Sequence, residues 1–162
     1  MGLTLQAKVL TVSDGVAGGT RDDKSGRALV EHLTSAGYSV AEHRVVADGV
    51  ESVATALREL AAGFEGFIVT TGGTGFGPRD LTPEGTSAAL EREAPGFVEA
   101  IRRVSDNDGR GFGLLSRAAA GTIGAALVCN LPGSASGAIE GLDVVLPAVP
   151  HALDLLRGGH PH

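Results

Sequence analysis

The feature that most constrains the fold of this chain is the alternation of short apolar runs with longer amphipathic stretches. Four runs predict strands, at residues 9–12, 38–46, 67–70 and 127–129. Between and after them, apolar residues recur at helical spacing, which predicts helices from the Asp22-Asp23 cap to Gly37, over 50–62, from Thr82, from Pro95, and over 136–145 and 147–156. This order predicts an α/β fold: a mainly parallel, doubly wound sheet with helices on both faces, in three α/β/α layers.

The polar alternation of residues 38–46 favours an edge strand, whereas the continuous apolar run 67–70 is typical of a strand buried on both faces. The length of 162 residues predicts one domain over 1–162, with a core of about 7–158 and a frayed C-terminal tail. Cys129 lies in an apolar run and is expected to be a buried, unreactive thiol.

Net charge and hydropathy exclude several classes of function. A net charge of −6 argues against a broad nucleic-acid-binding face. No apolar stretch approaches the roughly 18 residues of a membrane span, and the first residues lack the pattern of a signal peptide. We therefore expect no membrane or nucleic-acid partner and a cytoplasmic location.

The carboxyl ends of the four predicted strands are all polar or rich in glycine. In open parallel sheets, ligands bind outside these ends. We therefore expect one rim to carry residues 13–14, 48–49, 70–75 and 130–134.

The loop after the third strand carries the strongest motif, TTGGTGFGPRDLTP over residues 70–83. Four glycines within 72–77 let backbone N–H groups approach an anion, and a following helix would add its positive end. Arg79 could bind phosphate or carboxylate with its two-pronged guanidinium. The loop is neither a P-loop nor a dinucleotide fingerprint, because Pro78 stands where those motifs need Lys or Gly. Ala135 likewise replaces the serine of a hydrolase elbow.

Two aspartates, Asp80 and Asp48, each have two possible roles. Asp80 either caps the following helix or holds a cation that phosphates also bind. Asp48 either forms an Asp-Gly turn or pairs with Asp80 across the rim to bind Mg²⁺. The helix that follows is expected to use Thr82 as its N-cap and to fray at Gly85.

Other candidates carry a weaker signal. Ser116-Arg117 supplies a hydroxyl and a guanidinium, and Gly133-Ser134 opens a helix that could form a second anion site. Asp14 and Lys24 flank the first loop. None of the five histidines has the spacing of a metal site.

These residues resemble the Mog-type molybdenum-cofactor biosynthesis family, the molybdopterin adenylyltransferases. The resemblance extends from about Lys8 to Gly158. Its carriers are VSD at 12–14, DKSG at 23–26, Asp48, TTGGTG at 70–75, PRDLTPE at 78–84, LSRA at 115–118 and NLPGS at 130–134. The string GGTG…PRD…TPE is the most specific part.

The resemblance implies a homotrimer that uses Mg²⁺ and ATP to adenylylate molybdopterin and releases pyrophosphate. A separate enzyme, to which the product could be handed over, later inserts molybdate. The alternative is a B-type paralogue that binds or hands over the pterin with little or no turnover.

The same resemblance assigns roles to individual positions. Asp48 and Asp80 are expected to be catalytic and to hold Mg²⁺. Ser116 and Arg79 are expected on the pterin side. Nucleotide and phosphate contacts are expected at Ser13, Asp14, Thr71, Gly72, Gly73, Thr74, Gly75, Gly133 and Ser134.

Overall fold

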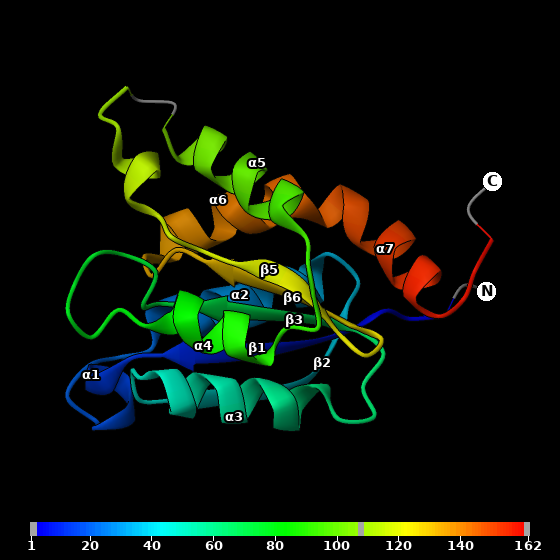
Figure 1. Cartoon of the computed structure of the whole chain (residues 1–162), viewed down its shortest axis with the longest axis horizontal. Helices are drawn as coiled ribbons and strands as arrows, with labels where there is room; N and C mark the ends of the chain where they lie inside the picture. Colours follow the sequence, from blue (N-terminus) through cyan, green and yellow to red (C-terminus); the bar gives the residue numbers. More distant parts are fainter. Residues whose placement is uncertain (1–2, 107–108, 161–162) are drawn as a thin grey trace.

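A six-stranded sheet in the order β2-β1-β3-β6-β5-β4 organises the computed structural model, which describes residues 3–106 and 109–160 (Figure 1). The strands are β1 (Gln6–Val12), β2 (Ser39–Val46), β3 (Phe67–Thr71), β4 (Arg92–Glu93), β5 (Ala120–Ile123) and β6 (Ala126–Leu131). The helices are α1 (Asp14–Ala17), α2 (Lys24–Ser35), α3 (Val50–Ala61), α4 (Thr82–Ala89), α5 (Pro95–Ser105), α6 (Ala135–Val145) and α7 (Val149–Leu156). Two 3₁₀ turns complete the set, η1 (Phe112–Leu115) and η2 (Leu146–Ala148).

Four of the strands are parallel and correspond to the four predicted from the sequence. β2, β1, β3 and β6 run in one direction, with Val9 opposite Val69 and Val69 opposite Cys129. Every residue of β3 and β6 is buried, whereas β2 alternates between exposed and half-buried positions at the sheet edge. The prediction of a buried third strand and an edge second strand is therefore confirmed.

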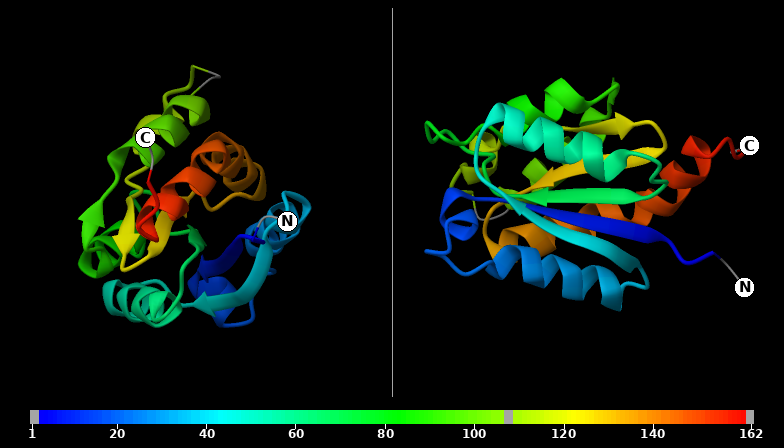
Figure 2. Two further views of the ribbon diagram at one scale, coloured as in Figure 1. Left: turned by 90° about the vertical axis from the view of Figure 1, so that its right-hand side faces the viewer. Right: turned by 90° about the horizontal axis from the view of Figure 1, so that it is seen from below.

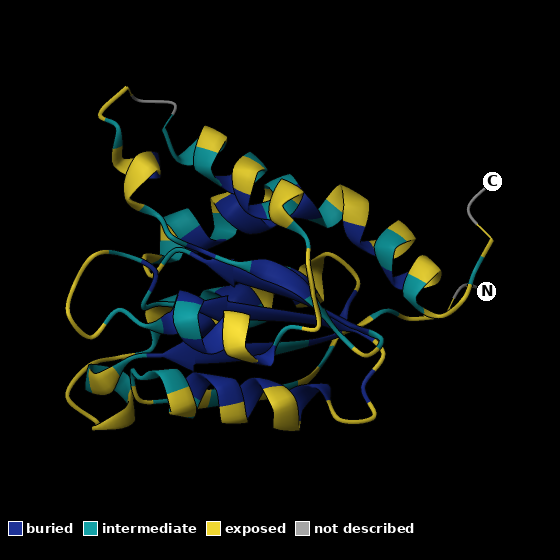
Figure 3. Ribbon diagram, in the orientation of Figure 1, coloured by how far each residue is buried: buried dark blue, intermediate teal, exposed yellow. Residues whose placement is uncertain are grey.

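Helices cover both faces of the sheet, which confirms the predicted α/β class (Figure 2). One core packs residues of α2, α5, α6 and α7 against the sheet, including Leu33, Ile101, Leu142 and Leu153. The other packs α3 against the opposite face through Val53, Leu57 and Leu60. Figure 3 shows the buried sides of these helices turned inward and their exposed sides outward.

Side-chain caps fix where two of the helices begin. Asp23 accepts a hydrogen bond from the backbone N–H of Gly26 at 2.9 Å and so starts α2. Ser134 accepts one from the N–H of Gly137 at 3.1 Å and starts α6. Each cap satisfies an N–H group that the helix itself leaves without a partner.

The sequence prediction missed the antiparallel strands β4 and β5, which extend the sheet beyond β6. β5 has four residues and β4 only two, so neither shows enough periodicity to be recognised. Ile123 pairs with Ala126 across a tight turn whose Gly124 has a φ of 56°. The two-residue loop between them begins with Gly124, and a glycine at this loop position is a hairpin signal that the sequence does carry.

Two expectations for α4 were wrong. Leu81, not Thr82, occupies the N-cap position, and no side chain caps the helix. The Thr82 hydroxyl instead donates to the carbonyl of Gly72 at 2.8 Å, because the preceding loop folds back over the helix start. Gly85 does not mark a frayed turn: it is buried, and a Cβ there would lie 2.6 Å from the Cβ of Val53 in α3.

Parts of the predicted loop and tail lie outside the described residues. These are residues 107–108 of the loop at 105–111 and residues 161–162 of the tail. Within the described ranges, no helix combines the length and apolar character needed to cross a membrane. The extent of the domain over 1–162 stays a prediction.

Candidate active site

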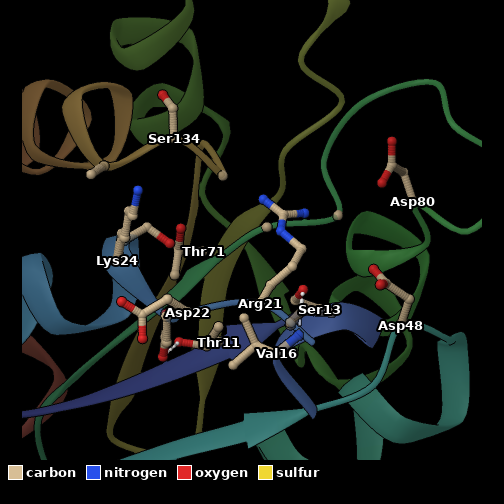
Figure 4. Close-up of a pocket in the computed structure, with 17 residues that line it drawn as sticks. Thr11, Ser13, Val16, Arg21, Asp22, Lys24, Asp48, Thr71, Asp80 and Ser134 are labelled. Atoms are coloured by element: carbon tan, nitrogen blue, oxygen red, sulfur yellow. Dashed lines mark hydrogen bonds between the residues drawn. The ribbon is translucent and has the colours of Figure 1, made fainter. Parts of the chain in front are cut away.

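A cavity of about 620 Å³ lies at the carboxyl ends of the parallel strands (Figure 4). We call it the main cavity. Its walls come from the end of β1 and the loop that follows, from Asp48 after β2, from residues 71–73 at the end of β3, from residues 133–135 between β6 and α6, and from Asp80. The four predicted strand ends therefore do share one rim. The structure brings Asp48 and Asp80 to the same cavity, while their catalytic role stays a prediction.

Asp14 and Asp48 tie the first two loops of the rim together. The backbone N–H of Asp14 donates to Oδ2 of Asp48 at 2.9 Å, and the N–H of Asp48 donates to Oδ1 of Asp14 at 3.1 Å. Gly49 follows with a φ of 142° at a bend of the chain before α3, so the chain changes direction at Asp48-Gly49 while Asp48 also lines the cavity. The two interpretations of Asp48 are therefore compatible.

Arg79 lines neither of the two cavities at this rim, because it pairs with Asp14. Its Nε and Nη2 donate to the two carboxylate oxygens of Asp14 at 3.0 and 3.2 Å. Nη2 also donates to the carbonyl of Asp48 at 2.9 Å. The hydrogen bonds from Arg79 lower the pKa of the Asp14 carboxyl, so this residue is a carboxylate at neutral pH.

The glycine loop approaches Asp48 so closely that side chains would not fit. Gly72 and Gly73 have φ values of 101° and 71°, a region that L-residues rarely enter. A Cβ on Gly73 would lie 3.1 Å from Oδ1 of Asp48. Both glycines therefore let the main chain form the cavity wall beside this carboxylate.

Three of the four hydroxyls expected to bind phosphate, those of Ser13, Thr71 and Ser134, are engaged with the backbone. Thr71 is fully buried and donates to the carbonyl of Pro132 at 2.7 Å. Ser13 accepts from the N–H of Val16 at 3.2 Å, and Ser134 caps α6. Among the predicted phosphate contacts, Ser13, Thr71, Gly72, Gly73, Gly133 and Ser134 line the main cavity.

Asp80 does not cap α4, so one of its two alternatives is excluded. Its Oδ2 accepts from the N–H of Gly77 at 2.9 Å, and its own N–H donates to the Gly77 carbonyl at 3.0 Å. This turn leaves Oδ1 without a hydrogen-bond donor in the described part of the chain, and the same holds for Oδ1 of Asp48.

These two free carboxylate oxygens fit Mg²⁺, which prefers one or two carboxylates together with phosphate and water oxygens. Residues 3–106 and 109–160 contain no group of three or more His, Cys, Asp or Glu side chains able to hold a metal. A magnesium ion here would therefore need oxygens from a bound phosphate.

Arg117 stabilises the glycine loop through hydrogen bonds to its backbone carbonyls. Its backbone N–H donates to the carbonyl of Thr74 at 2.9 Å, its Nε to that of Gly75 at 2.9 Å, and its Nη2 to that of Asp80 at 2.6 Å. It also pairs with Glu84, and this pairing lowers the pKa of the Glu84 carboxyl. The guanidinium predicted beside Ser116 is thus a brace for the loop that carries Asp80.

Sequence reasoning missed much of the wall formed by the first loop and the start of α2. Thr11, Arg21, Asp22 and Ser25 line the main cavity beside Lys24. The motif DKSG at 23–26 was a signal for the start of α2, but nothing in the sequence distinguished Arg21.

His43, which had no predicted role, braces this wall from the edge strand. Asp23 accepts from the Thr11 hydroxyl at 2.7 Å and lies 2.9 Å from Nε2 of His43. Because Asp23 also caps α2, the contact from β2 holds the helix start at the cavity.

A second cavity of about 370 Å³ adjoins the main one. Ser116, Thr74 and Gly75 line it, together with the apolar side chains of Phe112 and Leu115. Gly133 and Ser134 line both cavities, so the turn after β6 is their common wall.

Comparison with known proteins identifies relatives along nearly the whole chain. The chain is 42% identical over 154 residues to the "Molybdenum cofactor biosynthesis bifunctional protein" of Chlorobaculum tepidum, covering 94% of this chain and 49% of that one. The chain thus spans about half the length of this relative. It is 34% identical over 160 residues to the "Molybdopterin adenylyltransferase" of Helicobacter pylori, covering 97% and 90% of the two chains.

A solved structure shares the fold as well. The molybdopterin biosynthesis enzyme MoaB of Thermus thermophilus superposes with a TM-score of 0.87 at 41% identity, over 98% of this chain and 99% of that one. The family model described as "Probable molybdopterin binding domain" matches residues 8–151. With its parallel sheet, its glycine loop and these matches, the chain belongs to the molybdopterin binding domain family.

Proposed function

We propose that this protein acts in molybdenum-cofactor biosynthesis as a molybdopterin adenylyltransferase. It would transfer AMP from Mg-ATP to the terminal phosphate of molybdopterin and release pyrophosphate. The observation that carries the proposal is the convergence of Asp48, Asp80 and the main chain of Gly72 and Gly73 on one cavity. The relative named molybdopterin adenylyltransferase supports it over 97% of the chain.

The two adjoining cavities suggest how two substrates would be arranged. We assign the nucleotide to the main cavity and the pterin to the second cavity, where Ser116 lies. The reacting phosphates would then meet at the common wall of Gly133 and Ser134. We assign Arg79 an indirect role, because it contacts Asp14 and the Asp48 carbonyl and lines neither cavity.

In the proposed reaction an oxygen of the pterin phosphate attacks the α-phosphorus of ATP. The bond from the α-phosphorus to the α–β bridging oxygen breaks, and pyrophosphate leaves with that electron pair. The protein's task is to position the phosphates and to compensate their charge. Asp48 and Asp80 would hold Mg²⁺, which supplies positive charge beside the phosphates. The N–H groups of the glycine loop would face the same oxygens.

Replacing either aspartate tests this proposal. Asp48→Asn and Asp80→Asn keep the shape of the side chain but remove the charge that would hold the metal. We expect pyrophosphate release with molybdopterin, ATP and Mg²⁺ to fall by at least about 100-fold in each variant. The fold should persist, as measured by circular dichroism.

Asp154→Asn is the matched control, because Asp154 is an exposed carboxylate of α7 that lines neither cavity. It should keep full activity. A wild-type rate in either cavity variant would refute the role assigned to that aspartate.

A second candidate function is a pterin-binding protein without turnover. The MoaB structure favours it, because this B-named protein is 41% identical to the chain, whereas the relative named molybdopterin adenylyltransferase is 34% identical. This function predicts that the protein binds molybdopterin and leaves Mg-ATP intact. Measuring pterin binding and pyrophosphate release on one preparation separates the two candidates.

We also propose a homotrimer that works in the cytoplasm and hands its product to the molybdate-inserting enzyme. The exposed apolar side chains of Phe112, Leu114 and Leu115, beside the second cavity, are consistent with a surface that another protein covers. Light scattering tests the assembly, and a monomer mass would contradict it.

A further inference from the structure

The charged side chains that line the main cavity differ in whether they have a partner within the protein. Asp22 and Asp23 are paired with other side chains, whereas Asp48 and Asp80 each accept only a backbone N–H and keep one oxygen free. Among the described residues, the Arg21 guanidinium and the Lys24 ammonium have no partner. The pairs are Asp22 with Arg27, Asp23 with Thr11 and His43, Asp48 with the N–H of Asp14, and Asp80 with the N–H of Gly77. The cavity therefore holds two positive charges that are available to a bound anion.

The aliphatic part of the Arg21 side chain, its stem, packs directly over Gly15. A Cβ on Gly15 would lie 2.6 Å from Cδ of Arg21 and 2.8 Å from Cγ, so the stem passes where a side chain would stand. The N–H of Arg21 donates to the Gly15 carbonyl at 3.1 Å, and that of Thr20 donates to the same oxygen at 2.9 Å. These contacts fix the loop beneath the arginine.

The supported stem carries the guanidinium into the cavity. Figure 4 shows Arg21 extending inward, with Lys24 on one side of it and Asp48 and Asp80 on the other. A chain of phosphates that begins beside the aspartates would meet Arg21 as it runs toward Lys24. A single phosphate at the aspartates would not extend in that direction.

We propose that Arg21 binds the terminal phosphates of the nucleotide and stabilises the pyrophosphate as it leaves, with Gly15 providing the space for its stem. This inference rests on the proposed function. The chemistry is that of a planar guanidinium, which donates two parallel hydrogen bonds to phosphate oxygens. Charge accumulates on the leaving pyrophosphate as its bond to the α-phosphorus breaks, and Arg21 is placed to compensate it.

Binding of inorganic pyrophosphate tests the inference without requiring turnover. In calorimetric titration with pyrophosphate and Mg²⁺, Arg21→Ala should bind pyrophosphate at least about tenfold more weakly than the wild type. Arg21→Lys should recover part of the affinity, since it restores the charge without the two-pronged geometry. Binding of AMP, which lacks the terminal phosphates, should not change in either variant.

Two further variants separate the position of Arg21 from its charge. Gly15→Ala keeps the arginine but displaces its stem, so pyrophosphate binding should weaken; in the Arg21→Ala background it should have no further effect. Arg103→Ala removes one exposed charge from α5, outside both cavities, and should bind as the wild type does. Circular dichroism verifies that each variant folds.

The outcomes distinguish this inference from the proposed function. If Arg21→Ala binds pyrophosphate as tightly as the wild type, or if the wild type binds none, the inference is overturned even where adenylyl transfer is measured. If binding depends on Arg21 but no pyrophosphate is released from ATP, the anion site stands and the proposed reaction fails.

Discussion

Three aspartates of one rim differ only in their surroundings, and the surroundings separate their roles. Asp14 is paired through both oxygens with Arg79, so it has little capacity left for a ligand. Asp48 and Asp80 each use one oxygen for a backbone N–H and keep the other available. Hydrogen bonding thus identifies which carboxylates can receive a cation.

Cys129 shows the opposite case, a reactive group that the fold makes inert. Burial raises the pKa of its thiol to about 12, so almost no thiolate exists at pH 8. We expect no measurable reaction of the folded protein with a disulfide reagent at pH 8, and stoichiometric reaction after unfolding in guanidinium chloride. Rapid labelling of the folded protein would contradict this.

The same shift gives the sign of a pH effect. A buried thiol ionises less readily than an unfolded one, whose pKa is near 9.0. The folded state therefore binds more protons above pH 9, and its stability falls as the pH rises beyond that value.

At the residue scale, the sequence predicts the positions of the acidic side chains of the site better than those of its arginines. Asp48 and Asp80 follow strand ends, and the topology rule brings such residues together. Arg79 and Arg21 have long side chains, and their direction depends on contacts from distant loops, with Asp14 and Gly15 respectively. No local pattern encodes those contacts.

At the scale of elements, close packing between α3 and α4 depends on one glycine. We predict that Gly85→Ala destabilises the protein by about 1–2 kcal/mol, because the strain of overpacking exceeds the gain in helix propensity. The added Cβ would lie 2.6 Å from the Cβ of Val53 and 2.8 Å from the carbonyl of Val50, and a carbonyl cannot move aside cheaply. Urea unfolding measures the change.

Gly96→Ala is the control for this measurement. Gly96 is also helical, in α5, but nothing lies within 4 Å of the position its Cβ would take. This substitution should stabilise the protein by about 0.5–1 kcal/mol. A loss of stability there, or a gain in Gly85→Ala, would contradict the packing argument.

Elements with a clear apolar pattern, whether a continuous run or a helical period, were predictable, and elements without one were not. The continuous apolar run that forms β3 and the amphipathic α3 were identified nearly to their ends. β4 is held only by its pairing with β5, with Arg92 opposite Thr122, so its sequence alone contains no signal.

For the whole molecule, the sheet divides into two parts with different tasks. The parallel part, β2-β1-β3-β6, brings four strand ends to the main cavity. The segment leading into β5 supplies Ser116 and η1 to the second cavity. The change from parallel to antiparallel order at β6 therefore places the two cavities side by side.

The turn of Gly133 and Ser134, which borders both cavities, has a thermodynamic consequence. If filling one cavity shifts this turn, the factor by which the first ligand alters the affinity for the second must equal the factor in the reverse direction. Titrating pterin with and without a non-hydrolysable ATP analogue, and the analogue with and without pterin, should give one reciprocal factor different from unity. A factor of one in both titrations would mean that the shared turn is rigid and the two ligands bind independently.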